Sequence, residues 1–346
     1  MTIFNEKIYS HCMLTIKKIR ILVSIFFFSL VFSLTPASTQ TAERYGVSVS
    51  PLVGILYGQG EEILYKYSNR DQYASQLLWD LKPLVYMGLA VDFGPRNPFH
   101  SSGLIAASSI KFGLPFKTGA MEDRDWMNPQ HDWLTHYSRH DAYAMNAILA
   151  DISAGYSWRL SDTIALSAYG EFSFMYLSWS GDNGYAQYPE YDSDDNYPAW
   201  SSSFPKKYFS GKSILYTQTW FILSPGVSLK GRINRLFSLQ WNINYSPLIY
   251  ATARDDHLLY PSRTFGDYLF FGHYLKGGGK VIFTPLNNLN LTLSLLYRYI
   301  TGSRGDSYWK YAGAEVSDIV SKNYDGGAGH STLEIELAAR IYIKAD

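Results

Sequence analysis

Cysteine and charge are both scarce in this sequence. Cys12 is the single cysteine in 346 residues, so we expect no disulfide to stabilise the fold. Charged residues form only 17% of the chain, below the roughly 25% of soluble domains. The 30 basic residues balance the 30 acidic ones. This balance argues against a general nucleic-acid binder, which normally carries a basic excess.

Hydropathy is moderate, whereas aromatic residues are plentiful. The mean hydropathy of −0.13 excludes a helical membrane protein. Aromatic residues make up 16% of the chain, and 29 of them are tyrosines. Few charges, many tyrosines and moderate hydropathy leave two main classes, a secreted β-protein or a transmembrane β-barrel.

The N-terminus has the layout of a signal peptide. Three basic residues precede an apolar run over residues 21–34, and small residues follow it. A run of about 14 residues is shorter than the roughly 20 that a membrane-spanning helix needs. We therefore predict a cleaved signal over residues 1–40, cut between Ala37 and Ala42, and a single barrel domain over residues 41–346.

Alternation of apolar and polar side chains dominates the remainder. It is clearest in residues 237–246, 289–299 and 333–341, and no helical periodicity competes with it. These runs reach about ten residues, longer than a usual globular strand, and a tilted strand of that length crosses the apolar layer of a membrane. A soluble sandwich would also alternate, so length is the discriminating feature.

The pattern predicts an all-β, ten-stranded antiparallel transmembrane β-barrel with long extracellular loops. Short turns alternate with long polar loops along the chain, as in bacterial outer-membrane barrels, and the even strand count leaves both termini on the short-turn side. The predicted strands are 45–57, 74–93, 103–118, 142–158, 163–180, 213–231, 236–254, 267–283, 289–302 and 331–344.

Two acidic clusters come at the upper ends of the third and seventh predicted strands, over residues 122–126 and 254–257. Both strands run toward the long loops, so the clusters would share one rim. A His beside a carboxylate is held in one tautomer and can act as a general base, and opposed carboxylates can hold a water molecule. Such a set could activate water against a peptide carbonyl, although solvated loop acids would produce the same spacing.

Four short motifs in this order resemble those of the omptins, a family of outer-membrane endoproteases. Residues 123–127 resemble the D-x-D-W-M element, and residues 255–257 the D-x-H element. Residues 138–140 are similar to the S-R-H stretch, and residues 76–80 to the second strand of the family.

The resemblance implies an aspartic-type endopeptidase at the extracellular mouth of an outer-membrane barrel. Asp123 and Asp125 would form a catalytic couple facing a dyad of Asp255 and His257, with water as the attacking species and no metal or other cofactor. The substrates would be polypeptides cut next to basic residues. We expect a monomer whose other partners are outer-membrane lipid and lipopolysaccharide.

The resemblance also implies a substrate pocket and a lipid site. Glu62 matches a family acid that binds the basic side chain of the substrate, but Ala253 occupies the position of a second acid, so we expect a weaker basic preference. Tyr169 and Glu171 match part of the family's lipopolysaccharide contact, where Ser173 replaces an Arg. Lipopolysaccharide is therefore an expected requirement for activity, although one of the family's contact residues is replaced.

The phase of the seventh strand leaves one question open. Alternation continued past Tyr245 puts Asp255 and His257 on the outward, lipid-facing phase. Either a bulge at Pro247 resets the phase, or the dyad lies above the bilayer, where phase matters less. Asp123 and its couple partner fall on the inward phase if no irregularity intervenes.

Two alternatives remain at the level of sequence. A catalytically inactive barrel could serve as an adhesin or porin, and a secreted β-sandwich could serve as a binding module. The spacing of His131, His136 and His140 fits no common zinc pattern, so we predict no metal site.

Overall fold

The computed structural model describes residues 45–346 except 67–68, 191–195, 260–261, 312–323 and 344–346. The chain divides into two compact units, Met1–Tyr45 and Gly46–Asp346, and the second contains the strands described below. The predicted signal peptide and its cleavage site lie outside the described residues. In the part of the chain that the structure describes, no helix has the length and apolar character needed to cross a membrane.

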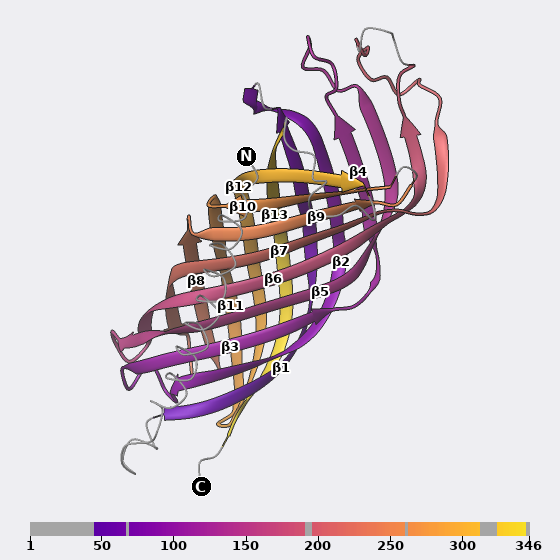
Figure 1. The fold of residues 1–346 in the computed structure, drawn as a ribbon. Coiled ribbons are helices and arrows are strands. Elements are labelled where there is room, and N and C mark those ends of the chain that lie inside the picture. The colour runs from indigo at the N-terminus through magenta and orange to yellow at the C-terminus, as the bar shows by residue number, and fades with distance from the viewer. Residues whose placement is uncertain (1–44, 67–68, 191–195, 260–261, 312–323, 344–346) are drawn as a thin grey trace. The chain divides into compact units, whose positions relative to one another are not determined.

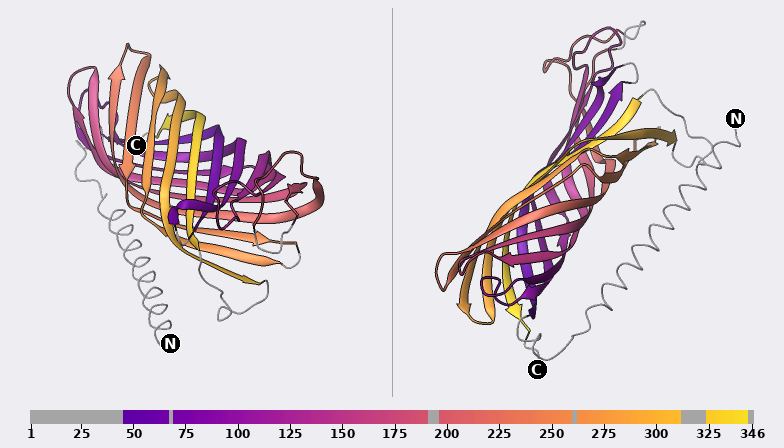
Figure 2. Two further views of the ribbon diagram at one scale, coloured as in Figure 1. Left: turned by 90° about the horizontal axis from the view of Figure 1, so that it is seen from above. Right: turned by 90° about the vertical axis from the view of Figure 1, so that its left-hand side faces the viewer.

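Antiparallel strands form one closed sheet (Figure 1; Figure 2). The first described strand pairs with the last, which closes the ring. The described strands are β1 (Tyr45–Lys66), β2 (Asn69–Pro95), β3 (Gly103–Gly113), β4 (Phe116–Asp125), β5 (His136–Arg159), β6 (Ile164–Gln187), β7 (Lys207–Arg232), β8 (Phe237–Ser246), β9 (Ile249–His257), β10 (Arg263–Phe270), β11 (His273–Leu286), β12 (Leu289–Tyr311) and β13 (Tyr324–Tyr342).

Thirteen described segments make ten barrel strands, because three of the strands are interrupted. Both β3 and β4 lie between β2 and β5. Both β8 and β9 pair with β7, and both β10 and β11 pair with β12. The predicted all-β, ten-stranded antiparallel barrel is therefore confirmed.

The outer face has two zones. Its lower part is a belt of exposed apolar side chains, such as Met87 and Leu89 on β2 and Leu293 and Leu295 on β12. An outward apolar band of this kind faces lipid in membrane barrels. Above the belt the outward side chains form ion pairs, for example Lys117–Asp141 at 2.7 Å. The upper part of the barrel therefore stands in water.

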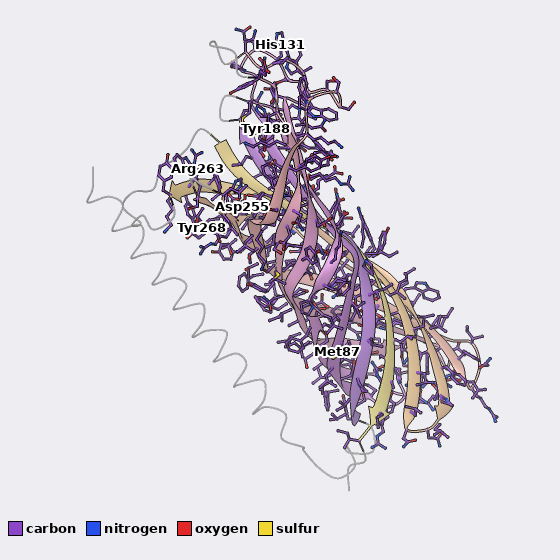
Figure 3. All side chains as sticks on the ribbon, turned by 90° about the vertical axis from the view of Figure 1, so that its right-hand side faces the viewer. Met87, His131, Tyr188, Asp255, Arg263 and Tyr268 are labelled. Carbon is purple, nitrogen blue, oxygen red and sulfur yellow. The ribbon has the colours of Figure 1, made fainter. Side chains whose placement is uncertain are left out.

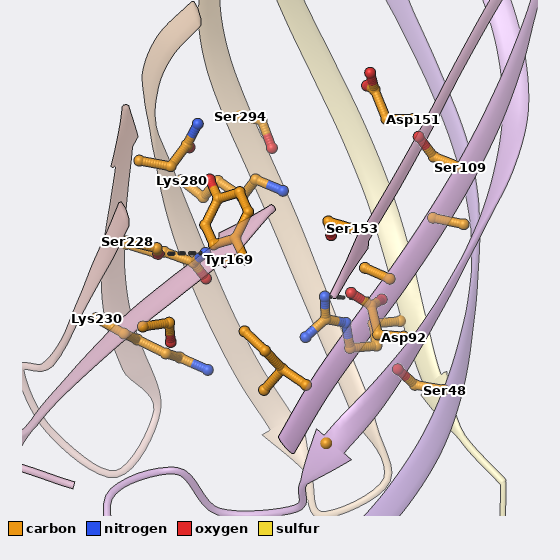
Figure 4. Close-up of a pocket in the computed structure, with 18 of the residues that line it drawn as sticks. Ser48, Asp92, Ser109, Asp151, Ser153, Tyr169, Ser228, Lys230, Lys280 and Ser294 are labelled. Atoms are coloured by element: carbon orange, nitrogen blue, oxygen red, sulfur yellow. Dashed lines mark hydrogen bonds and ion pairs between the residues drawn. The ribbon is translucent and has the colours of Figure 1, made fainter. Parts of the chain in front are cut away.

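Charged side chains fill the lower lumen in pairs. Lys111 pairs with Glu334 and Glu336, and Lys276 pairs with Glu171 at 2.7 Å. A cavity of about 310 Å³ remains among these groups. Its lining includes Asp92, Asp151, Tyr169, Lys230, Lys280 and Ser294 (Figure 4).

The strands continue well above the apolar belt, further than the sequence predicts. The first strand runs to Lys66 instead of residue 57, and β12 runs to Tyr311 instead of residue 302. Residues 138–140, expected between two strands, lie within β5. Backbone pairing continues where the alternation of side chains has become irregular, so periodicity alone ends these strands too early.

An irregularity between β8 and β9 resets which side chains point inward. In β8, Trp241 and Ile243 face outward, whereas in β9 Ala251 and Asp255 face inward. The neighbouring strand β7 is continuous, and its four-residue step from Ile222 to Gly226 faces a five-residue step from Ile249 back to Asn244. One extra residue beside Pro247 is therefore a β-bulge, and the bulge alternative is the one that the structure adopts.

Interruptions at a similar level occur in other strands. Inward positions change from odd to even between Leu81 and Leu84 of β2. Between β3 and β4 they change twice, so that Thr118 is buried and then Met121 and Asp123 are buried. The predicted inward phase of Asp123 is correct, but two compensating shifts produce it.

Candidate active site

The dyad residues Asp255 and His257 lie near the end of β9, above the apolar belt. Figure 3 shows Asp255 in the upper part of the barrel, well above Met87. His257 Nε2 lies 2.7 Å from Asp255 Oδ2, and the Asp255 side chain is only 3% exposed. Because Nε2 bonds to the carboxylate, the Nδ1 atom of the imidazole remains free to accept a proton.

The aspartate couple, Asp123 and Asp125, lies on the inward face of β4. Asp123 is buried, and Ser138 Oγ lies 3.5 Å from its Oδ2 atom, while Ser75 hydrogen-bonds to Asp125. Both carboxylates lie near enough to the imidazole of His257 to act on it electrostatically. The structure therefore brings together two acidic clusters that are about 130 residues apart in sequence.

Burial and charge shift the pKa values of these groups. Burial disfavours the imidazolium of His257, but the carboxylates of Asp255 and of the couple outweigh it and raise the pKa of His257 to about 9. Burial, and then the charge of Asp125, raises the pKa of the Asp123 carboxyl well above its ordinary value. Burial also raises the pKa of Asp125 to about 6, although the Ser75 hydrogen bond and His257 oppose this. Groups whose protonation is set by one another in this way are typical of catalytic sites.

Glu62 points into the same space from β1. It is 3% exposed, and its Oε2 atom has no hydrogen-bond partner among the described residues. Burial, followed by the charges of Asp255, Asp267 and Asp123, raises the pKa of Glu62 well above its ordinary value. The predicted substrate acid thus shares an electrostatic environment with the dyad and the couple.

Four buried acids around this space each have one oxygen without a partner among the described residues. A buried acceptor without a partner is costly, so native proteins rarely keep one without a functional reason. Each of these oxygens could accept a hydrogen bond from water or from a donor on a ligand. The acids are Glu62, Asp123, Asp255 and Asp267.

An aromatic layer, formed by Trp79, Trp179 and Tyr216, packs at the base of the site. All three side chains are fully buried. The rings of Trp79 and Tyr216 stack with centroids 5.4 Å apart, and Trp179 lies 5.9 Å from Tyr216. Trp79 is opposite Met121, two residues below Asp123 on β4. The layer supplies the low dielectric that raises the pKa values of the neighbouring carboxyls.

Other residues singled out in the sequence have structural partners. The ring nitrogens of His140 lie 2.9 Å from Ser213 Oγ and 3.3 Å from Ser138 Oγ. His136 Nδ1 lies 2.9 Å from Thr135 Oγ1, and His131 stacks on Trp133. The prediction that these histidines do not bind a metal together stays a prediction.

The residues matched to a lipid contact face the lumen instead of the membrane. Glu171 bonds to Lys276, Ser173 Oγ donates to Asp151 at 2.5 Å, and Tyr169 OH donates to Asn244. Their assignment to lipid contact is wrong, because the barrel wall separates them from lipid. Lipopolysaccharide dependence consequently rests on family resemblance alone.

Sequence reasoning missed three residues at the site. Ser75 hydrogen-bonds to Asp125, and Tyr188 lies close enough to the couple for its pKa to be raised by burial and by both carboxylates. Tyr188 directly follows the last residue of β6, and Figure 3 shows it above Asp255. Asp267 lies on the inward face of β10. An acid on the inward phase of a predicted strand was the only signal for it.

Comparison with known proteins agrees with this geometry. The family model described as the omptin family matches residues 43–338. The plasminogen activator of Yersinia pestis is 26% identical over 302 residues, which cover 82% of this chain and 88% of that protein. The crystal structure of outer membrane protease OmpT from Escherichia coli superimposes with a TM-score of 0.75 at 16% identity, covering 90% of this chain and 99% of that one.

The likeness to the solved structure establishes the fold, and the family model extends over most of the chain. The matched region includes the dyad, the aspartate couple and Glu62. The chain therefore belongs to the omptin family.

Proposed function

We propose that this protein is an outer-membrane endopeptidase that hydrolyses peptide bonds next to basic residues, using water and an aspartic-type site at the extracellular mouth. Membership of the omptin family supports a protease function and an outer-membrane location. The observation that carries the mechanism is the 2.7 Å contact between His257 and Asp255, set beside two carboxylates that raise the imidazole pKa.

In the proposed reaction, His257 is the general base. Asp255 accepts a hydrogen bond from the Nε2–H group and so fixes the tautomer, which leaves Nδ1 to remove a proton from a water molecule held between the dyad and the couple. The Asp255 carboxylate then stabilises the imidazolium. The raised pKa of His257, about 9, means that the proton is retained readily after transfer.

The aspartate couple has complementary roles. Burial and the charge of Asp125 raise the pKa of Asp123, which favours its protonated form, and in that form the carboxyl can donate to the developing oxyanion of the peptide. Asp125, with a pKa of about 6, is mostly ionised and can orient the water. The collapse of the tetrahedral intermediate returns the proton from His257 to the leaving amine.

A porin is less consistent with this barrel. The aromatic layer packs across the lumen from β2 to β6 and β7, and ion pairs such as Lys111–Glu334 and Lys276–Glu171 lie beneath it. Single-channel conductance of the refolded protein in a planar bilayer should therefore be negligible. Open-channel currents would favour the porin alternative.

The location and partners are part of the proposal. The acidic space opens at the end of the barrel with the long loops, which we assign to the extracellular side, and we expect the protein to act as a monomer. Whole cells that express it should cleave a membrane-impermeant peptide. Addition of lipopolysaccharide to the refolded protein, with lipid-free detergent as the control, tests the expected lipid requirement.

The direct test of the function is peptide cleavage by refolded His257→Ala protein. Loss of a general base lowers turnover by about 10²–10⁴-fold. Glu122→Ala is the matched control, because Glu122 lies on the outer face and pairs with Arg124 at 2.6 Å and Arg139 at 3.1 Å. Heat-dependent mobility in gel electrophoresis reports whether each variant is folded. Wild-type cleavage rates in a folded His257→Ala barrel would contradict the assignment.

A further inference from the structure

Asp267 lies directly across from the position where the substrate pocket lacks an acid. On the paired strands β9 and β10, Ala253 faces Asp267. Both side chains point into the lumen, and both are buried. The missing carboxylate of one strand is therefore matched by a carboxylate on its hydrogen-bonded neighbour.

The Asp267 carboxyl is buried and incompletely bonded. It is 3% exposed, it accepts a hydrogen bond from Ser307, and its Oδ1 atom has no partner among the described residues. The side chain reaches across β12 to β13, where a Cβ atom on Gly326 would lie only 2.2 Å from Oδ1. The glycine leaves the room that this carboxylate occupies.

Glu62 approaches the same place from the other side. It pairs with Ala328 on β13, two residues from Gly326. The charge of Asp267 contributes to the raised pKa of Glu62. Glu62 and Asp267 thus form an acid pair in which one buried oxygen of each residue, Oε2 and Oδ1, has no partner among the described residues.

The cation nearest in sequence to Ala253 does not neutralise this pair. Arg254, which follows Ala253, points to the outer face, where its Nε lies 2.8 Å from Asp256. The polar neighbour at the base is Tyr216, whose hydroxyl accepts a hydrogen bond from Gln218 at 3.0 Å. A hydroxyl cannot balance two carboxylates, and neither acid forms an ion pair with another described residue, so a positive charge supplied by a ligand could complete the pair.

We propose that Asp267 replaces the acid missing at Ala253 and, together with Glu62, binds the guanidinium or ammonium group of the substrate residue that precedes the scissile bond. This inference rests on the proposed function and makes the pocket a two-acid pocket, in place of the one-acid pocket expected from the sequence. A guanidinium can bond to carboxylates on two sides at once, because its donors form a planar fork. The basic preference is consequently strong.

The test compares kcat/KM for two peptides that differ only in Arg or Gln before the cleaved bond. Asp267→Asn should lower the value for the Arg peptide by about 10–100-fold, the range for a lost charged hydrogen bond, and leave the Gln peptide nearly unchanged. Asp267→Ala combined with Ala253→Asp, which returns the acid to the neighbouring strand, should recover most of the Arg preference. Asp256→Asn is the control, since Asp256 faces outward and bonds to Arg254 and Thr264.

Stability gives a second readout. A residue that serves the fold loses stability when changed, whereas a buried acid kept for a ligand does not. The Asp267→Asn barrel should therefore unfold at the wild-type temperature or above it. A marked loss of thermal stability, or an equal loss of cleavage for both peptides, would overturn the specificity role.

Binding of benzamidine, a small cation that mimics the substrate side chain, tests this inference separately from the proposed function. Its affinity is measured by calorimetric titration of the refolded barrel, which needs no turnover, and benzamide is the neutral control ligand. If Asp267→Asn cleaves with an unchanged Arg-to-Gln ratio, the inference fails while the protease function stands. If the wild type cleaves nothing, a roughly tenfold or greater loss of benzamidine affinity in Asp267→Asn still supports the acid pair, and equal affinity refutes it.

Discussion

Asp255→Asn is the most informative change at the dyad, because it removes one charge and keeps the shape of the side chain. The carboxylate lies 2.7 Å from His257 Nε2 and is buried, so little solvent weakens its effect. An amide can present its NH₂ group to Nε2, in which case the imidazole proton moves to Nδ1. The nitrogen that should accept the proton of water is then blocked.

Two separate effects should follow. Turnover at the best pH should fall by about 10²–10⁴-fold, as for loss of a general base. The pKa of His257, about 9 in the native site, should also fall. Removing an opposite charge at this distance is worth about 1–3 pKa units. The base must be neutral to act, so activity rises as pH approaches the pKa, and this rise should move to lower pH in the variant.

The assay is kcat/KM for an Arg peptide measured from pH 5 to pH 10, with barrel integrity checked by heat-dependent gel mobility. Asp256→Asn serves as the control, because Asp256 lies between the dyad residues in sequence but bonds to Arg254 on the outer face. An unchanged pH midpoint in Asp255→Asn would refute the electrostatic reasoning. Equal damage from Asp256→Asn would show that β9 is read in the wrong phase.

Other substitutions test neighbouring parts of the site. Asp125→Asn removes a more distant carboxylate from the imidazole, so the pH midpoint should fall by less than in Asp255→Asn; a larger fall in the same pH series would argue against the dyad. Glu122→Ala should leave steady-state rates close to those of the wild type, because Glu122 lies on the outer face and pairs with Arg124 and Arg139. A greater loss than in Asp125→Asn would show that Glu122, and not Asp125, belongs to the site. Glu62→Gln should reduce kcat/KM for Arg peptides by about tenfold or more and spare neutral peptides, as a peptide-library profile would report.

The sequence was sufficient for the architecture and for the motif-borne part of the site. Side chains along β12 and β13 alternate between the apolar outer face and the polar lumen of the barrel. This alternation can be seen in the sequence of each strand by itself. Asp123, Asp125, Asp255 and His257 were predicted from motifs in family order, and the structure brings them together. Their catalytic roles stay predictions.

The remainder depended on pairing between strands, which a single sequence does not state. The proposed role of Asp267 in the substrate pocket depends on its position opposite Ala253. That position is set by the register between β9 and β10, which neither strand shows by itself. Glu171 and Ser173 matched a family pattern, yet one residue of phase decides whether such a pattern faces lipid or lumen. The upper part of β1, which contains Glu62, was also not predicted as strand, because polar side chains interrupt the alternation there.

The extra residue beside Pro247 has a consequence for how such a barrel can evolve. The bulge changes the inward positions from even residue numbers in β8 to odd ones in β9. The lower and upper halves of this strand therefore follow separate alternation patterns of inward and outward side chains. Loss of one codon at this point would leave a four-residue step on each strand between the paired positions that flank the bulge, so the bulge would disappear while Asp255 kept its partner Tyr216 and its inward phase. The position of the dyad is thus fixed by pairing with β7 and not by the number of residues that join β9 to β8. Gene duplicates of this kind of scaffold could lose the bulge in one mutational step and keep both the membrane anchor and the inward dyad.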